Sequence, residues 1–458
     1  MQYGIDMTIR HILEDEETAA LFQKCLPGVD RLLGTNAEAK NMTLRQLAGF
    51  ARGRIPQQAL EALDAGLKEI GEKNGGISPA ERRRMERYKA IAAEVVARGK
   101  HPATHNQDAV YPGQPWLDVC GNRIQAHAGG FLYENDTYYW YGENKEFTDG
   151  TCEIWTWGIR LYCSKDFYNW EDMGLIIPPV VDDPASELYP EKRVDRPHIL
   201  KNPNTGKYIC WLKNCGADAC FNVLTADSLT GPWELVNSHY NPFGMNIGDF
   251  DIALDESCNT AYLYCEAEHA MVVGMRLNAD FTVAEQIVSR QYENIDPPFT
   301  REGVTVLKRE NKLWMLTSGM TGYVPNQSDS AVSHGYEQPF VSVGDPYVDD
   351  ESLSSFNSQI GQVFKVPGKK DLYLTVADRW VPGYPVDREL ALRLRRAVAA
   401  RYDENVTASA EDHACLAASP NLATANTSLA DYVILPITFE SGVPKIYWRD
   451  QWTLEEFE

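Results

Sequence analysis

The chain has 458 residues, and its 43 basic against 65 acidic side chains give a formal net charge of −22. A chain of this length is too long to fold around one small hydrophobic core, and we predict two structural parts. Binding to the phosphate backbone of a nucleic acid requires a basic surface, which this acidic composition disfavours. We therefore expect no nucleic-acid partner. No stretch approaches the ~20 apolar residues of a membrane span, and the first residues show no basic segment followed by an apolar core. We therefore expect no membrane partner and a cytoplasmic protein.

Residues 1–105 are predicted to form a small α-helical domain. Within Gln57–Asn74, apolar residues recur at the three- and four-residue spacing of one helix face, and they are Leu60, Leu63, Leu67 and Ile70. Nothing in this region carries chemistry. We predict that it serves in oligomerisation or docking, with a homo-oligomer as the expected assembly.

The next helix has clear boundary signals. Ser78-Pro79 supplies a cap and a first-turn proline, Glu81 stands at the reciprocal capping position, and Gly99 follows the end of the run. The basic cluster Arg82-Arg83-Arg84 lies among acidic residues, which predicts an exposed helix face.

From about residue 110 the apolar pattern becomes an alternation, and one unit recurs five times: two apolar strands around a tight polar turn. The five units begin at Gly129, Arg196, Phe250, Glu302 and Ser358. A period of about 50–65 residues with one hairpin per unit is typical of a β-propeller. We therefore predict a mainly-β fold, a five-bladed β-propeller over residues 106–458. Residues 386–427 are predicted to be an insertion near the last blade, and the strand-like segment from Tyr432 to close the ring.

The innermost strand of each blade lines the propeller axis, so the first residues of these strands are expected to meet around one centre. They are His127, Asp195-Arg196, Asp249, Glu302 and Gln359, and the first hairpin ends in Glu143. Such a set suits glycoside hydrolysis, in which a protonated carboxyl donates to the leaving oxygen and a second group delivers water. A neighbouring carboxylate keeps the acid protonated by repulsion.

Other chemistries have no support in the sequence. No HExxH motif or tight His/Cys cluster occurs, and neither a GxSxG nor a P-loop motif is present. We therefore expect no cofactor and no metal ligands. The ten cysteines include no CxxC pair, and Cys210, Cys215 and Cys220 are predicted to be reduced thiols of the core or loops.

Longer motifs surround the predicted site residues: DVCGNRIQAHAGGFLYENDTYYWYGE, DRPHILKNPNTGKYICW, DFDIALDESCNTAYLY, REGVTVLKRENKLWMLTSGMTGY, NSQIGQVFKVPG and ADRW. Together they resemble glycoside hydrolase family 43, and more closely its exo-β-1,3-galactanase branch. The resemblance covers about residues 110–385 and 428–458, and it leaves out the helical region and the insertion.

The resemblance implies a five-bladed propeller that hydrolyses with inversion. Glu302, in Arg301-Glu302-Gly303, matches the family's general acid, and Asp249 matches the aspartate that orients this acid and tunes its pKa. Most of the family has an aspartate base at the start of the first blade. This chain has His127-Ala128-Gly129-Gly130 there instead.

The galactanase branch shares that loss, and a glutamine is thought to stand in for the base. Gln359 matches this glutamine, so we predict that it positions the attacking water. Glu143 matches the branch's substrate-binding glutamate and is kept as the rival base. The other predicted substrate-binding residues are His127, Asp195, Arg196 and Thr321.

The leading prediction is an exo-acting β-galactosidase that cleaves short β-1,3-linked galacto-oligosaccharides. Another family 43 activity, an arabinofuranosidase or a β-xylosidase, stays open because Ala128, Asp195 and His198 depart from the residues usual in the branch. A non-catalytic sugar-binding propeller also stays open, because the base aspartate is missing. Some relatives carry calcium, so the resemblance allows a structural calcium ion, although no ligand set in the sequence demands one.

Overall fold

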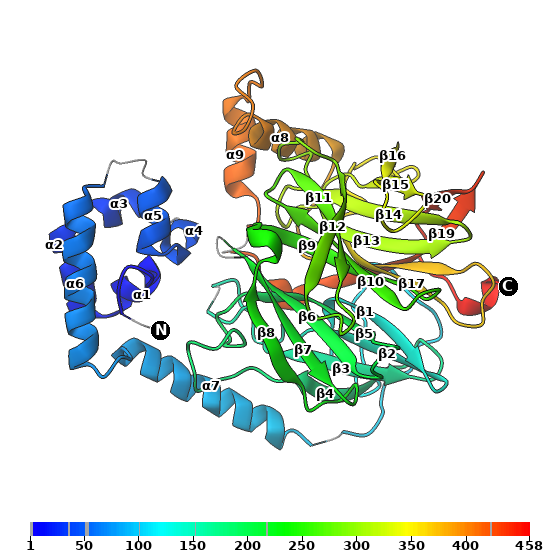
Figure 1. The fold of residues 1–458 in the computed structure, drawn as a ribbon, viewed down its shortest axis with the longest axis horizontal. Helices are drawn as coiled ribbons and strands as arrows, with labels where there is room; N and C mark the ends of the chain where they lie inside the picture. The colour runs from blue at the N-terminus through cyan, green and yellow to red at the C-terminus, as the bar shows by residue number, and fades with distance from the viewer. Residues whose placement is uncertain are drawn as a thin grey trace. The chain divides into compact units, whose positions relative to one another are not determined.

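The computed structural model describes residues 3–34, 37–50, 55–99, 101–151, 153–216, 219–421 and 424–458. Its internal contacts divide the chain into two compact units, one helical and one made mainly of strands (Figure 1). The helical unit comprises Met1–Lys100 with Pro179–Pro190, and the strand unit comprises His101–Pro178 with Glu191–Glu458.

In the helical unit, the first six helices contribute to one apolar cluster, and the seventh contributes none of its described residues to that cluster. Its helices are α1 (Ile9–Glu14), α2 (Glu16–Cys25), α3 (Val29–Leu33), α4 (Ala37–Asn41), α5 (Leu44–Phe50), α6 (Gln57–Lys73) and α7 (Pro79–Ala97). The predicted apolar face of α6 is confirmed, because Leu60, Leu63 and Leu67 are buried and Ile70 packs against the same cluster.

The start of α7 is confirmed at Ser78, whose hydroxyl accepts from the Glu81 N–H at 3.0 Å. The Glu81 carboxylate is directed elsewhere: it accepts from the Tyr189 hydroxyl at 2.5 Å and from Arg84 Nη2 at 2.8 Å. The prediction that Arg82–Arg84 form an exposed face is wrong at Arg84, which is buried. Its guanidinium also binds Glu14, and two carboxylates offset the cost of burying one charge.

Among the described residues, the strand unit forms five four-stranded antiparallel sheets. Blade one is β1 (His127–Glu134), β2 (Thr137–Glu143), β3 (Ile159–Ser164) and β4 (Glu171–Ile177); blade two is β5 (Val194–Lys201), β6 (Tyr208–Asn214), β7 (Cys220–Ala226) and β8 (Glu234–Tyr240). Blade three is β9 (Ile247–Asp255), β10 (Thr260–Ala267), β11 (Met271–Leu277) and β12 (Ala284–Gln291). Blade four is β13 (Arg301–Arg309), β14 (Lys312–Gly319), β15 (Asp329–Ser333) and β16 (Val341–Gly344); blade five is β17 (Gln359–Lys365), β18 (Tyr373–Arg379), β19 (Asp431–Glu440) and β20 (Val443–Ile446).

The first strands of the blades form a closed ring, since β1 contacts β5, β5 contacts β9, β9 contacts β13, β13 contacts β17, and β17 contacts β1. This arrangement confirms the predicted five-bladed β-propeller with a small N-terminal helical region. The segment from Tyr432 supplies the two outer strands of blade five. The first and last segments of the strand unit also pair through Val110 and Trp452, whose backbone groups exchange hydrogen bonds of 2.9 and 3.1 Å.

We call the side of the propeller where β1, β5, β9, β13 and β17 begin the front face, and the side of the following hairpin turns the rear face. The insertion leaves blade five after Arg379 and returns at Asp431, so it lies on the front face. It contains helices α8 (Arg388–Ala399) and α9 (Ala410–Ala418), joined by an Arg396–Asp412 ion pair of 2.8 Å. Its residues 422 and 423 lie outside the described residues.

A β-bulge interrupts the first strand of several blades within its first two residues, directly after His127, Asp195 and Glu302 in blades one, two and four. Ala128, Arg196 and Gly303 occupy this position in blades one, two and four, with φ of 46°, 47° and 59°. A bulge bends the strand and redirects the side chain beside it, at a cost in strain for a residue with a Cβ atom. The N–H groups of these three residues are held by carboxylates of the preceding blade, which are Asp378 (2.8 Å), Glu143 (2.9 Å) and Asp249 (3.0 Å).

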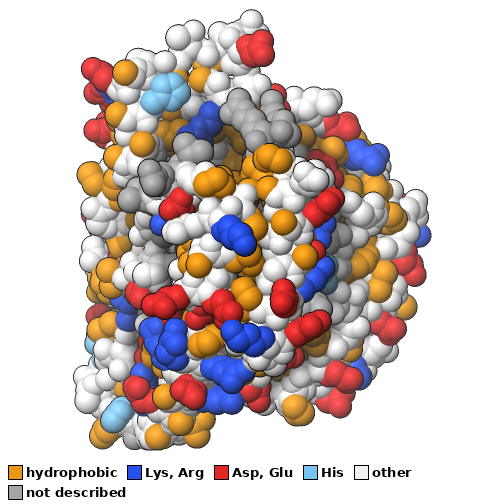
Figure 2. Space-filling model, turned by 90° about the vertical axis from the view of Figure 1, so that its left-hand side faces the viewer, with side chains coloured by type: hydrophobic (Ala, Val, Ile, Leu, Met, Phe, Trp, Pro, Cys, Tyr) orange, Lys and Arg blue, Asp and Glu red, His pale blue; other side chains and the backbone are white. Residues whose placement is uncertain are grey.

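The surface shown in Figure 2 mixes basic and acidic side chains, which stand next to one another most densely in its lower part. No helix within the described ranges combines the length and apolar character needed to cross a lipid bilayer.

Candidate active site

Four of the predicted site residues are joined by direct contacts on the front face. Arg196 is the centre of the group: its Nε lies 2.6 Å from Asp249 Oδ1, and its Nη2 donates to Gln359 Oε1 at 2.6 Å. Gln359 Nε2 in turn donates to Glu302 Oε1 at 3.0 Å. The blades thus bring together one guanidinium, one amide and two carboxyl groups, as the repeat predicts.

Asp249 is a buried carboxylate with three donors. Its Oδ1 accepts from both Arg196 and Lys213, each at 2.6 Å, and its Oδ2 accepts from the Gly303 N–H at 3.0 Å. Burial alone would raise the pKa of Asp249, but the two cations outweigh it and hold this pKa well below its usual value. Asp249 therefore stays ionised, and it holds the backbone directly after Glu302.

Glu302 has the opposite electrostatic environment. Removal from solvent, followed by repulsion from ionised Asp249, raises the pKa of Glu302 to about 8, although Arg196 and Lys213 act against the shift. The carboxyl is therefore protonated at neutral pH. Two neighbouring carboxyl groups held in opposite protonation states are the pattern expected where one acts as a general acid.

Asp195 lies on the other side of Lys213, at 3.4 Å. Burial raises the pKa of Asp195 to about 6, since its single cationic contact is longer than those of Asp249. Burial would lower the pKa of Lys213, but Asp195 and Asp249 outweigh this effect and raise it. Lys213 is therefore a permanent cation that the two aspartates share unequally.

The Gln359 side chain is fixed at both ends of its amide. Its Oε1 accepts from Arg196 and from Trp380 Nε1 at 3.3 Å, and its Nε2 donates to Ser318 Oγ at 3.2 Å as well as to Glu302. These four bonds fix which way the amide faces. A cation on the oxygen also disfavours protonation of that oxygen.

Glu143 is enclosed in the structure, with 1% of the residue exposed. Its Oε1 accepts from the Arg196 N–H, and its Oε2 lies 2.6 Å from Lys145 Nζ and accepts from the Thr156 hydroxyl at 3.1 Å. The carboxylate supports the bulge of blade two, the same task that Asp378 performs for blade one. The geometry gives no support to Glu143 as a base, because its oxygens are already occupied.

Two other predicted substrate-binding residues lie outside this network. His127 has no exposed surface; its Nδ1 lies 2.8 Å from Asp378 Oδ1 and its ring stacks on Tyr432 at 4.9 Å. Thr321 is half-buried, and its hydroxyl donates to the Val324 carbonyl at 2.7 Å. The predicted sugar contact of His127 is therefore not supported, because its ring is sealed between blades one and five.

The glycines of blade one have a packing reason. A Cβ atom at Gly130 would lie 1.5 Å from Gln362 Oε1 of the neighbouring blade. Gln362 occupies this space because its Oε1 accepts from the Phe131 N–H at 3.0 Å and its Nε2 donates to the Tyr141 hydroxyl at 3.2 Å. A side chain of blade five thus fills the room that an acidic side chain at Gly130 would need.

Sequence reasoning missed several members of the network, and a signal for them exists. A residue near the start of an inner strand pairs with one near the end of the second strand, so the same repeat alignment could have been applied to the second strands. The pairs are His127 with Glu143, Asp195 with Lys213, Glu302 with Ser318, and Gln359 with Asp378. Lys213, Ser318 and Asp378 would have been found in this way.

Within either unit, taken over the described residues, no three His, Cys, Asp or Glu side chains lie close enough together to hold a metal ion. The allowance for a structural calcium ion stays untested.

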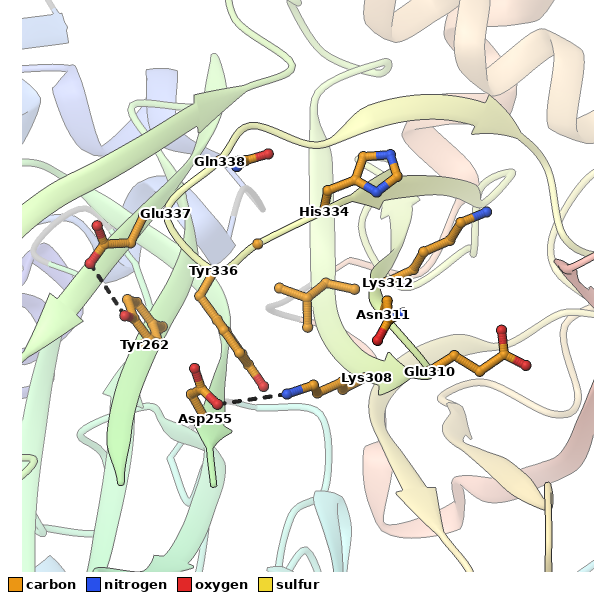
Figure 3. Close-up of a pocket in the computed structure, with 12 residues that line it drawn as sticks. Asp255, Tyr262, Lys308, Glu310, Asn311, Lys312, His334, Tyr336, Glu337 and Gln338 are labelled. Atoms are coloured by element: carbon orange, nitrogen blue, oxygen red, sulfur yellow. Dashed lines mark hydrogen bonds and ion pairs between the residues drawn. The ribbon is translucent and has the colours of Figure 1, made fainter. Parts of the chain in front are cut away.

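A cavity of about 470 Å³ lies on the rear face, between blades three and four (Figure 3). Two polar contacts cross it, Asp255 to Lys308 at 3.6 Å and the Tyr262 hydroxyl to Glu337 at 3.2 Å. None of the predicted site residues lines this cavity. Its charged groups lie at strand ends and turns, and the front-face network remains the candidate active site.

A five-bladed propeller whose front face joins a protonated glutamate, an ionised aspartate and a fixed amide has the features of an enzyme that hydrolyses glycosidic bonds. The sequence model described as glycosyl hydrolases family 43 matches residues 130–395, more than half of the chain. The chain belongs to glycosyl hydrolase family 43. A search of curated protein sequences finds no match.

Solved structures of similar fold include three galactan-related enzymes. A family 43 β-1,3-galactosidase (BT0265) has a TM-score of 0.61 and 25% identity, and the match covers 77% of this chain and 65% of that protein. An exo-β-1,3-galactanase from Phanerochaete chrysosporium, solved with galactose, has a TM-score of 0.60 and 21% identity over 76% of this chain and 68% of that one. The exo-β-1,3-galactanase from Clostridium thermocellum has a TM-score of 0.57 and 22% identity, and the match covers 75% of this chain and 66% of that one. The chain spans about two thirds of the length of these relatives.

Proposed function

We propose that this glycoside hydrolase releases galactose from the non-reducing end of β-1,3-linked galacto-oligosaccharides, with inversion at the anomeric carbon. The observation that carries the proposal is the pair formed by Glu302 and Gln359. A protonated carboxyl faces an amide, the aspartate base that most of the family has at the start of blade one is missing, and the sequence resembles the galactanase branch, which shares this loss. The similarity to a β-1,3-galactosidase at 25% identity agrees with it.

Glu302 is the general acid of the proposed reaction. Its proton passes to the glycosidic oxygen as the bond to the anomeric carbon breaks, so the leaving sugar departs as a neutral alcohol. Asp249 keeps its negative charge throughout. It raises the pKa of Glu302 before the transfer, and through the Gly303 N–H it fixes the strand that carries the acid.

Gln359 is the water-positioning group. Arg196 at its oxygen opposes protonation of the amide, so the amide serves to orient water by hydrogen bonding. Asp195 is the candidate for taking up the proton of the water, because its pKa of about 6 makes it an ionised carboxylate at neutral pH. It must accept this proton directly from the water, since Arg196 and Lys213 are cations with no lone pair to relay it. In this scheme Glu143 supports blade two and does not touch the sugar.

Inversion requires a sugar to enter between acid and water. The two groups of an inverting enzyme are about 6.5–9.5 Å apart, whereas Glu302 Oε1 and Gln359 Nε2 are 3.0 Å apart in this structure. The substrate must therefore displace this hydrogen bond. The proposal predicts that galactose bound at the site separates the two side chains.

The test is proton NMR of the purified chain acting on β-1,3-galactotriose, whose leaving group is galactobiose, so that the free galactose first released carries the newly formed anomeric configuration. α-Galactose as the first product supports the exo-acting, inverting mechanism, and β-galactose as the first product contradicts inversion. Failure to release galactose, together with hydrolysis of an aryl arabinofuranoside or xyloside, contradicts the galactose specificity. Galactose affinity without turnover of any glycoside favours the sugar-binding propeller.

A further inference from the structure

Two large aromatic side chains are exposed on the front-face loops of blade three. Phe243 and Phe299 each have 52% of their surface exposed. Phe243 lies in the short turn η1 (Pro242–Gly244) directly before β9, which carries Asp249. Phe299 lies in the loop between β12 and β13, three residues before Glu302.

The loops that carry them are bonded into one structure through the β10–β11 turn. The Glu268 N–H donates to the Asn246 carbonyl at 3.0 Å, and Glu268 Oε1 accepts from the Asn246 N–H at 2.9 Å. On the other side, the Thr300 hydroxyl donates to the His269 carbonyl at 2.9 Å. We call the three loops, residues 241–246, 268–270 and 292–300, the blade-three rim.

Phe299 projects from a firmly held backbone. The Pro298 carbonyl accepts from the Met320 N–H at 2.9 Å and from Asn326 Nδ2 at 3.1 Å, and Asn326 is buried. The Phe299 carbonyl accepts from Arg301 Nε at 2.8 Å. Arg301 directly precedes Glu302 in β13, and Met320 and Asn326 follow β14, the strand that pairs with β13. The backbone around Phe299 is therefore held by the same two strands that position Glu302.

Phe243 is held in a strained conformation. Its φ of 54° and ψ of 20° are left-handed, which is rare for a bulky residue and costs about 1–3 kcal/mol. The turn is clamped by Asn241, whose Nδ2 donates to the Ala219 carbonyl at 2.7 Å and the Met245 carbonyl at 3.1 Å. A bound ligand would account for holding a strained, exposed phenyl ring on a front-face loop.

His269 places a polar group on the same rim. Its N–H donates to Glu266 Oε1 at 2.6 Å, and its Nδ1 lies 3.4 Å from Glu266 Oε2. Glu266 is buried, so it orients the imidazole, while 54% of the His269 side chain remains exposed. A rim with aromatic rings and an oriented imidazole offers both apolar surface and hydrogen bonding.

We propose that the blade-three rim is the subsite for the leaving-group sugar, a neutral hexopyranose. The C–H-rich face of the ring packs against Phe299 and Phe243, and His269 bonds a hydroxyl of the same sugar or of the next. An aromatic ring buries apolar surface without requiring charge on its ligand, which suits a neutral saccharide. The inference rests on the proposed function, because it assigns the sugar on the far side of the bond that Glu302 protonates.

The experiment compares two substrates that share the galactosyl group. β-1,3-Galactobiose has a sugar leaving group, whereas β-galactosyl fluoride has only fluoride. Phe299→Ala and Phe243→Ala are expected to lower kcat/KM on galactobiose by about tenfold each, as covering half a phenyl ring supplies roughly that factor. On the fluoride both variants should stay within twofold of the parent chain.

Tyr133→Ala is the matched control, because this aromatic residue is 38% exposed and lies on the rear face. It should leave both substrates unaffected. An equal loss on galactobiose and on the fluoride would show a structural role for the phenylalanines and overturn the proposal. No loss on either substrate would overturn it as well, including the case in which the variants only change the oligomeric state. If the parent chain hydrolyses the fluoride of another sugar and not galactobiose, the proposed function fails by itself, and the rim is then tested with a disaccharide of that sugar.

Discussion

Strands β9 and β13 carry charged residues at both ends, and the two ends differ in how those charges are handled. On the front face, Asp249 contacts two cations at 2.6 Å, and the side chains of Asp249 and Arg196 are only 8% and 9% exposed. On the rear face, Asp255 and Lys308 are 3.6 Å apart, and the Lys308 side chain is 49% exposed. The rear face holds the cavity of about 470 Å³, whereas the front face holds the buried charges.

The difference shows at which end of these strands two carboxyl groups can be held in opposite protonation states. Water screens the rear-face pair, so neither charge acts strongly on the other. On the front face the same residue types are buried. There the pKa of Glu302 is raised and the pKa of Asp249 is lowered, so Glu302 keeps its proton at neutral pH while Asp249 is ionised. The open rear-face cavity does not separate its carboxyl groups into one protonated and one ionised group in this way.

The largest effect is expected from Glu302→Gln, which keeps the shape and removes the proton donor. The kcat on β-1,3-galactobiose should fall about 10³-fold, with sugar binding retained, since this is the usual contribution of a general acid. Single-turnover kinetics and calorimetric titration with galactose measure the two quantities.

Asp255→Asn, at the other end of β9, is the control for this variant and should keep kcat within twofold. Comparable losses in both variants would remove the contrast between the two faces. Retention of most activity by Glu302→Gln would exclude Glu302 as the acid.

Glu143→Ala tests whether this carboxylate is a structural support. Truncation leaves Lys145, itself 1% exposed, as an unpaired buried charge, which costs about 3–5 kcal/mol of stability. Urea unfolding of the variant should therefore show a large fall in midpoint. Glu143→Gln preserves the acceptor for the Arg196 N–H and should lose less. A normal midpoint with complete loss of kcat would return Glu143 to the role of base.

Much of the fold and part of the site could be predicted because the repeat carries both. Alternating apolar strands around polar turns define five hairpins, and equivalent positions must converge on one axis, which predicts that Arg196, Asp249, Glu302 and Gln359 meet, as their contacts show. The sequence does not show how far a side chain is covered. His127 stands at the equivalent position of blade one, and Glu143 pairs with it from the second strand, yet Tyr432, Asp378 and Lys145 enclose the two side chains through contacts from neighbouring strands and blades.

Gln359→Ala should lower kcat about 10²-fold, because the water loses its fixed partner and Arg196 is free to reorient. The midpoint of unfolding should change little, since Gln359 is half-buried and leaves no lone charge behind. This separates it from Glu143→Ala, which is expected to lose stability first. Activity near that of the parent chain would exclude Gln359 from positioning water.

Asp249→Asn should move the alkaline limb of kcat/KM. Burial, together with repulsion from ionised Asp249, raises the pKa of Glu302 to about 8, so the acid loses its proton, and the rate falls, as pH rises through that value. Asparagine at position 249 removes the repulsion from the Asp249 charge. The attraction of Arg196 and Lys213 for ionised Glu302 is then no longer opposed by that charge, so the pKa of Glu302 falls. The limb should therefore shift to lower pH by about one unit, in a pH–rate series on β-galactosyl saccharides. A limb that does not move would show that another group sets it.

The smallest effect is expected from Lys308→Met on the rear face. Lys308 contacts Asp255 at 3.6 Å and lies 5.5 Å over the Tyr336 ring, and the exposure of its side chain lets water replace both interactions. We expect a stability loss of less than about 1 kcal/mol in urea unfolding and unchanged kcat on β-1,3-galactobiose. The methionine keeps the apolar stem against the tyrosine, so the measurement isolates the charge. A fall in kcat with unchanged stability would mean that charge on the rear face reaches the reaction, and the separation of the two strand ends would then be wrong.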